Sequence, residues 1–373
     1  MSGIAEETIL LLQGGGALGA YQGGVVQELC RSETPIDWVA GISIGAINAA
    51  IVAGNPPEHR AAKLESFWSR ISDSAVPDAL IHGFVPRSLS DGASAAWITA
   101  FGVPGFFKPR LLPPLFGLPG TPAALSVYDT APLRETLEEH VDFDLINSGR
   151  IRLSVGAVNV TSGNFAYFDT TERKIGPEHI MASGALPPGL PPVQIDGEYY
   201  WDGGIVSNTP LQYVIEVRET ARPATIFQVD LFSARGPMPQ TLADAAEREK
   251  DIRFSSRTRL NTDDVLKKQE VGKALARLLD RLPAELRDDP DSRLLGEMIA
   301  CARTPVAIMH LIYRAKRFET DAKDYLFSHS AMLEHWTAGR TDVQRSLNHP
   351  DWVNRDRNKP GVSVFDLTRG DDA

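Results

Sequence analysis

Apolar positions in the first 70 residues fall into short continuous runs separated by longer stretches with helical periodicity. Continuous runs predict buried strands at residues 8–13 and 37–40, and the periodic stretches predict helices at residues 17–30 and 58–70. Residues 44–53 are small and apolar throughout, which is typical of a helix buried on every side. Because strands and helices alternate, the pattern predicts an α/β fold around a mostly parallel sheet.

Between residues 150 and 232 the pattern changes to paired strands. Residues 150–160 alternate apolar and polar side chains, and residues 164–169 are the expected hairpin partner. A second hairpin is predicted around Asp196-Gly197, a dipeptide that favours two-residue turns. Residues 224–232 follow as a further buried strand. The sheet is therefore expected to carry antiparallel strands beside its parallel ones.

The sequence beyond residue 240 is mainly helical in pattern. Apolar side chains recur at helical spacing over residues 271–282, and a last helix is expected at residues 330–347. A strand at residues 305–313 could complete the sheet, whereas the polar tail from Asn354 is expected to fray. We therefore predict a core of residues 1–236 and a mainly helical C-terminal extension, residues 237–373, that packs on it.

Residues 71–126 differ from the rest of the core. Prolines and aromatic residues are dense in this segment, and it has no clear periodicity. Long segments of this kind usually form a functional cover or a disordered insertion, and the high apolar content argues against disorder. We expect a lid or cap, with its aromatic side chains either facing a lipid surface or packed into the core.

The composition limits the partners and the compartment. The chain has 373 residues, a formal net charge of −10 and only two cysteines. The acidic balance argues against nucleic acid as a main partner, because binding phosphates needs a basic surface. Two cysteines do not make a disulfide framework, and the acidic N-terminus does not resemble a signal peptide. We expect a cytoplasmic protein, and any membrane contact should be peripheral.

A serine lies at the junction of the strand at residues 37–40 and the buried helix that follows. The sequence there is Gly41-Ile42-Ser43-Ile44-Gly45, a G-x-S-x-G pattern. In a tight strand-to-helix turn this pattern exposes a nucleophilic hydroxyl, and the flanking glycines avoid clashes. The alternative interpretation is an ordinary serine that caps the helix.

The first strand runs into a glycine loop at residues 14–19. Bare backbone N–H groups at the start of a helix can stabilise the oxyanion that forms when a nucleophile attacks an ester. The same glycines also satisfy G-x-G-x-x-G, the dinucleotide fingerprint. That fingerprint needs an acidic residue at the end of the next strand, and Asp37 instead stands at the beginning of that strand.

A serine nucleophile needs a base, and Asp202 is the leading candidate. It ends a hairpin strand, and Gly203-Gly204 would let the backbone turn and bring the carboxylate to another loop. Alternatively, Asp202-Gly203 is only a turn. A third possibility is a Ser-His-Asp triad, for which His310 or His329 would supply the histidine in the order typical of α/β-hydrolases.

Taken together, these residues resemble the patatin-like phospholipase family. The glycine loop, the Ser43 turn and Asp202-Gly203-Gly204 are similar to its three motifs, and residues 182–193 are similar to its segment before the aspartate. The resemblance implies a three-layer patatin-like α/β fold over residues 1–236, a Ser43–Asp202 catalytic dyad, and no metal or organic cofactor. It assigns an oxyanion hole to Gly14, Gly15 and Gly16, and supporting positions to Gly19, Gly41, Gly45, Gly203, Gly204 and Asn208.

The resemblance also implies a substrate class. Members of the family hydrolyse lipid acyl esters, so we expect an acyl-enzyme on Ser43, with the protein at the membrane surface only peripherally. The family usually has Arg or Lys where this chain has Leu18. Without that charge, order in the loop, or contact with a lipid phosphate, must come from elsewhere. The contrasting hypothesis is a non-catalytic lipid-binding module on the same scaffold.

Overall fold

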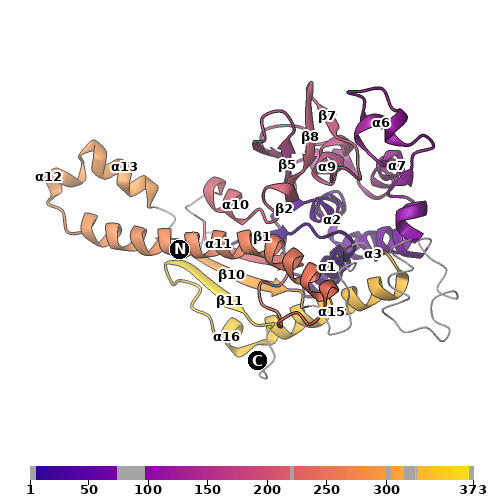
Figure 1. The fold of residues 1–373 in the computed structure, drawn as a ribbon. Helices are drawn as coiled ribbons and strands as arrows, with labels where there is room; N and C mark the ends of the chain where they lie inside the picture. Colours follow the sequence, from indigo (N-terminus) through magenta and orange to yellow (C-terminus); the bar gives the residue numbers. More distant parts are fainter. Residues whose placement is uncertain are drawn as a thin grey trace.

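A mixed sheet forms the centre of the protein (Figure 1). The computed structural model describes residues 6–73, 97–218, 222–299, 304–314, 324 and 326–368. The nine-stranded sheet has the order β11-β10-β9-β1-β2-β5-β8-β7, with β6 also paired to β5. The strands are β1 (Glu7–Leu12), β2 (Trp38–Ile42), β5 (Arg152–Asn159), β6 (Phe165–Asp169), β7 (Val193–Ile195), β8 (Glu198–Asp202), β9 (Ala224–Asp230), β10 (Pro305–Ile312) and β11 (Gly361–Asp366).

Strands β11 to β5 in this order are parallel to their neighbours, and β6, β7 and β8 are antiparallel. The predicted α/β fold with a mostly parallel sheet is confirmed. The sheet divides the core into two layers, because alternate residues of a strand face opposite sides. Leu10 and Leu12 of β1 belong to one buried cluster, whereas Ile9 and Leu11 belong to the other.

Helices cover both faces of the sheet. The larger cluster joins the sheet to α1 (Ala20–Arg31), α2 (Ile44–Ala53), α3 (Pro57–Asp73) and α15 (His329–Asn348). The smaller cluster includes α10 (Leu211–Val217), which contacts the long helix α11 (Leu242–Leu279). The remaining elements include α6 (Pro122–Leu125), α7 (Ala131–His140), α8 (Phe143–Asn147), α9 (Pro177–Ser183), α12 (Ala284–Arg287), α13 (Pro290–Met298), α16 (Pro350–Val353), β3 (Lys108–Pro109), β4 (Tyr128–Asp129) and 3-10 turns at Gly16–Gly19, Pro114–Phe116 and Gly203–Ile205.

The segment after residue 236 contributes directly to the sheet. Strand β10 pairs with β9, and β11 pairs with β10. Helix α15 packs closely on α1: a Cβ at Gly24 would overlap the Trp336 carbonyl oxygen, and a Cβ at Gly339 would overlap that of Tyr21. The expectation that the tail from Asn354 frays is wrong, because β11 forms the sheet edge and its Val362 and Val364 pack against the smaller cluster.

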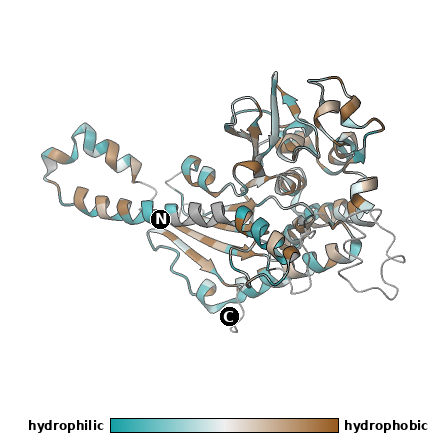
Figure 2. Ribbon diagram, viewed as in Figure 1, coloured by the Kyte–Doolittle hydropathy of each residue, from teal (hydrophilic) through white to brown (hydrophobic). Residues whose placement is uncertain are grey.

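The far end of α11 carries α12 and α13 away from the rest of the protein (Figure 1). Figure 2 shows hydrophobic residues along the central strands, and a mixture of hydrophobic and hydrophilic residues on this arm. The predicted helical spacing lies largely on α11, yet Val271 and Leu278 are 60% and 58% exposed. Helical periodicity therefore identified the element without identifying a buried face.

The predicted lid at residues 71–126 lies partly outside the described residues, since residues 74–96 are not among them. In the described part, Val103, Phe106 and Phe107 are buried. A larger group of apolar side chains is exposed: Trp97, Phe101, Leu111, Leu112, Leu115, Phe116, Leu118 and Leu125. One part of the described segment therefore packs into the protein, and another part leaves its apolar side chains exposed.

Candidate active site

Ser43 occupies the sharp turn between β2 and α2. Its backbone has φ 56° and ψ −126°, a left-handed conformation that is rare for any residue except glycine. A Cβ at Gly41 would overlap the Gly45 carbonyl oxygen, and a Cβ at Gly45 would overlap that of Leu12. The turn is therefore tight enough to require glycine on both sides of the serine.

The structure brings Ser43 and Asp202 together across 159 positions of sequence. The Ser43 hydroxyl donates a 2.6 Å hydrogen bond from Oγ to Asp202 Oδ2. Asp202 ends β8, its amide donates to the Ala185 carbonyl oxygen at 3.0 Å, and its Oδ1 accepts from the Gly204 amide at 2.7 Å. These bonds hold the carboxylate in one orientation toward the serine.

The Asp202 carboxyl is only 3% exposed. Burial raises its pKa from 3.8 to about 6, although the hydrogen bonds from Ser43 and Gly204 favour the charged form and act in the opposite direction. A carboxylate with a pKa near the working pH is a better proton acceptor than an exposed aspartate. At neutral pH this group is mostly ionised and can accept the serine proton.

The glycine loop lies directly beside the serine. A Cβ at Gly14 would be 2.9 Å from the Ser43 Cβ. The Gly14 amide donates to the Asn208 carbonyl oxygen at 3.3 Å, and the Asn208 side chain donates back to the Gly14 carbonyl oxygen at 2.8 Å. Within the described residues, the amides of Gly15 and Gly16 donate to no acceptor.

Hydrogen bonds from residues that the sequence analysis did not single out hold this loop in place. The Ala17 amide donates to the Asp324 carbonyl oxygen at 2.8 Å, and the Asp324 carboxylate pairs with Lys250 of α11 at 2.7 Å. Gln22 donates to the Gln13 carbonyl oxygen at 2.7 Å, just before the loop. Leu18 is fully buried. The loop is thus ordered by core packing and by the C-terminal segment instead of by a charge at position 18.

Ser183 supports the turn itself. Its hydroxyl accepts a 2.9 Å hydrogen bond from the Ser43 amide and donates a 2.6 Å bond to the Gly156 carbonyl oxygen. The only sequence signal for Ser183 was its place in the segment that resembles the family. Gly19 and Gly203 also stand where side chains would clash, since a Cβ would lie 2.6 Å from Ile44 Cγ1 and 2.7 Å from the Gly156 carbonyl oxygen, respectively.

No histidine in the described residues hydrogen-bonds to Ser43 or Asp202. His310 lies on β10, three strands away from β2 in the sheet order, and burial lowers its pKa to about 4. This arrangement does not support the triad alternative. The described part of the chain also contains no group of three or more His, Cys, Asp or Glu side chains that could hold a metal ion.

Two models of known families match this chain. The model of the patatin-like phospholipases matches residues 10–215, and a second model, described as patatin phospholipase, matches residues 252–359. The first match covers more than half of the chain, so the chain belongs to the patatin-like phospholipase family.

The individual relatives have low sequence identity to this chain. A cGAMP-activated phospholipase of Pseudomonas aeruginosa is 28% identical over 227 residues, which are 56% of each chain, so this chain spans about half the length of that curated relative. VipD from Legionella pneumophila is 16% identical, with a TM-score of 0.36, over 90% of this chain and 67% of its own. ExoU in complex with SpcU, from the type III secretion system of P. aeruginosa, is 13% identical over 97% of this chain and 75% of its own, with a TM-score of 0.27.

None of the helices in the described ranges is both long enough and apolar enough to cross a bilayer.

Proposed function

We propose that this protein is a serine-dependent lipid acyl hydrolase that uses a Ser43–Asp202 dyad. The observation that carries the proposal is the 2.6 Å hydrogen bond from the Ser43 hydroxyl to a buried carboxylate whose pKa is raised to about 6. The residues required for the chemistry all lie within residues 1–236, and we propose that residues 237–373 form an extension packed on this catalytic part.

In the first half of the reaction, Ser43 Oγ attacks the ester carbonyl carbon while its proton moves to Asp202. The negative charge that forms on the carbonyl oxygen is stabilised by the amides of Gly15 and Gly16, because preorganised donors lower the energy of this state. Gly14 takes a different role, since its amide already bonds to Asn208 and holds the loop. Asp202 returns the proton to the leaving alcohol, and an acyl ester remains on Ser43.

In the second half, water attacks the acyl-enzyme. Asp202 accepts a proton from the water, and the carbonyl oxygen again receives hydrogen bonds from the glycine loop. Collapse of the intermediate breaks the bond to Ser43 Oγ, which takes the proton back from Asp202 and releases a free fatty acid. No group other than water is consumed in this step.

We propose membrane lipids as the substrate, reached by peripheral contact from the cytoplasmic side. The exposed apolar side chains of residues 97–125 would enter the interface, because aromatic and large aliphatic groups partition favourably there. Two backbone hydrogen bonds join the residues that follow this segment to a loop near Asp202. The amides of Val127 and Tyr128 donate to the carbonyl oxygens of Pro188 and Gly189, in the loop that follows the Ala185 contact to Asp202.

A fluorophosphonate probe tests the nucleophile directly. It should label the wild-type protein at Ser43 and leave Ser43→Ala unlabelled, while Ser162→Ala, a change in an exposed turn, should label normally. Hydrolysis of phospholipid vesicles and of a soluble neutral ester should both fall to background in Ser43→Ala, and the ratio of the two wild-type rates identifies the preferred substrate. Labelling that persists without Ser43, or a wild-type protein without ester turnover, would contradict the proposal and favour the non-catalytic module.

A further inference from the structure

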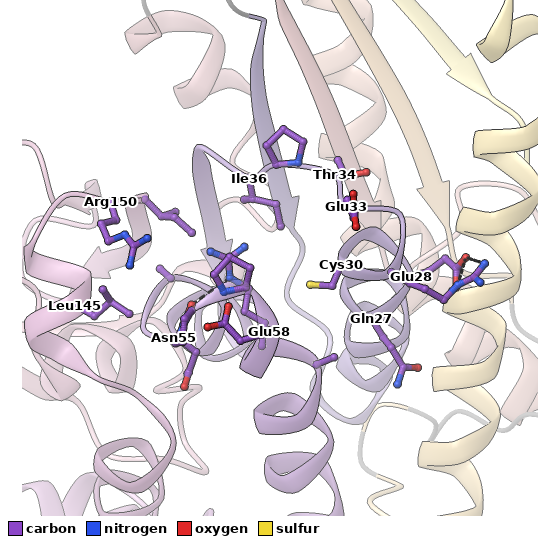
Figure 3. Close-up of a pocket in the computed structure, with 18 of the residues that line it drawn as sticks. Gln27, Glu28, Cys30, Glu33, Thr34, Ile36, Asn55, Glu58, Leu145 and Arg150 are labelled. Atoms are coloured by element: carbon purple, nitrogen blue, oxygen red, sulfur yellow. Dashed lines mark hydrogen bonds and ion pairs between the residues drawn. The ribbon is translucent and has the colours of Figure 1, made fainter.

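A cavity of about 780 Å³ (Figure 3) lies at the opposite end of the strands from Ser43. Ser43 follows the carboxyl end of β2, whereas this cavity is lined by Ile36, just before β2, and by Ile151, just before β5. Helices α1 and α2 end at the cavity, and α3 begins there. A volume of this size is typical of small-molecule sites.

Arg60 of α3 is the central feature of the cavity. It is only 7% exposed, and its Nε donates to the Asn55 carbonyl oxygen at 3.2 Å. Within the described residues, its two Nη atoms donate to no acceptor and its guanidinium forms no ion pair with a carboxylate. Burial lowers the Arg60 pKa, and the nearby Arg150 guanidinium lowers it further, despite opposing contributions from Cys30 and Glu58. A buried cation that forms no direct ion pair is costly, so an anion bound here would be stabilised.

The other charged groups around the cavity favour an anion. Glu28 is already neutralised by Arg31, which donates to it at 3.0 and 2.7 Å. Arg150 and Arg340 are exposed on the cavity lining, and neither pairs with an acidic side chain among the described residues. The remaining cations, Arg60, Arg150 and Arg340, outnumber the remaining acids, Glu33 and Glu58.

We propose that this cavity binds a small phosphorylated molecule, whose phosphate lies between Arg60 and Arg150. Phosphate suits this site because its oxygens accept paired hydrogen bonds from guanidinium groups that approach from different elements. The cavity is much larger than a phosphate, so the ligand has a body. The apolar side chains of Ile36, Leu145 and Ile151 can contact that body, and the Glu58 carboxylate can accept its N–H or O–H donors.

Isothermal titration calorimetry on the full chain tests the proposal with three probes: inorganic phosphate, AMP and adenosine. AMP should bind more tightly than inorganic phosphate, and adenosine should not bind. Arg150→Glu should weaken AMP binding at least about tenfold, because it replaces a phosphate donor with a like charge. Arg277→Glu, an equal charge change at an exposed position on α11, should not alter the affinity.

Cys30 provides a site-specific readout, since its side chain lines the same cavity (Figure 3). In a Cys301→Ser background, AMP should slow alkylation of Cys30, and Arg60→Lys, which keeps the charge but loses the planar fork, should reduce this protection. Absence of AMP and phosphate binding at millimolar concentrations, or binding that Arg150→Glu leaves unchanged, would overturn the proposal. The result does not depend on catalysis, because Ser43→Ala should bind AMP as the wild type does.

Discussion

Helices α1 and α2 each run from one end of the strands to the other, and the two ends differ in charge and in the site that they carry. At the carboxyl ends of the strands, α1 and α2 begin beside the glycine loop and Ser43, and their N-terminal amides carry partial positive charge that would favour the oxyanion we propose. At the amino ends of the strands, the same helices end at the Arg60 cavity, where their C-terminal carbonyl groups carry partial negative charge. Our two proposals therefore assign anion recognition to backbone amides at the carboxyl ends of the strands and to arginine side chains at their amino ends.

The largest effect on kcat should come from removing the proposed base, Asp202. Asp202→Asn keeps the shape of the side chain but cannot accept the Ser43 proton, so kcat should fall about 10³-fold, within the range typical of general-base catalysis. The measurement is steady-state hydrolysis of a soluble ester, with Asp288→Asn on the exposed α12–α13 arm as the control. If Asp202→Asn retained its turnover and His310→Ala lost it, a histidine-based mechanism would replace the dyad.

The tight turn should be almost as sensitive. In Gly45→Ala the new Cβ would overlap the Leu12 carbonyl oxygen, so the backbone must shift and the serine must move with it. We expect a loss of about 10²-fold in kcat, because misplacement by about 1 Å has this effect, together with a lower melting temperature. In the control Gly296→Ala, on α13, the new Cβ would have no atom within 4 Å. This variant should lower neither kcat nor the melting temperature. An active, stable Gly45→Ala protein would show that the turn tolerates a side chain.

The support beneath the glycine loop should contribute less. Lys250→Met removes the 2.7 Å ion pair to Asp324, whose carbonyl oxygen holds the Ala17 amide. A looser loop should reduce kcat about tenfold with little change in KM, since its donors act mainly in the transition state. Lys268→Met removes an exposed pair with Asp264 and is the matched control. Equal kinetics in the two variants would mean that the loop is rigid without the Lys250–Asp324 ion pair.

The pH dependence is the mildest test and it has a definite sign. Since the Asp202 pKa is raised to about 6, activity should halve near pH 6 and fall about tenfold for each further unit of acidification. The raised pKa also means that the folded state binds the Asp202 proton more tightly than the unfolded state does. This contribution to stability is complete below pH 3.8 and is lost as the pH rises through about 6. At pH 8, Asp202→Asn should therefore melt at a higher temperature than the wild type, although it is inactive.

Local sequence patterns predicted well the elements around Ser43, at the carboxyl ends of the strands. The buried helix at residues 44–53 was predicted with the bounds that the structure has, because small apolar residues on every side have no other stable environment. The Asp196-Gly197 hairpin delivered Asp202 to the end of β8, next to the serine turn. These features depend on a few adjacent residues, and short patterns record such dependence directly.

The features that sequence reasoning missed depend on distant segments. Strand β11 follows the polar residues 354–360, so the whole segment from Asn354 resembled a frayed tail, although Val362, Val364 and Phe365 lie in the strand. The Arg60 cavity draws its lining from α1, α3, α15 and the starts of two strands, and no single segment carries its signal. Asp324 acts through its backbone oxygen, which any residue type could supply.

The Asp324 contact has a practical meaning for engineering. Fusing residues 1–236 to the tail of a different family member would transplant the nucleophile and its base, yet it would discard the oxygen atom that steadies Ala17. Chimeras joined at that boundary should therefore inherit the reactive hydroxyl with a poorly formed oxyanion cradle, unless the donor tail brings an equivalent carbonyl to the same spot.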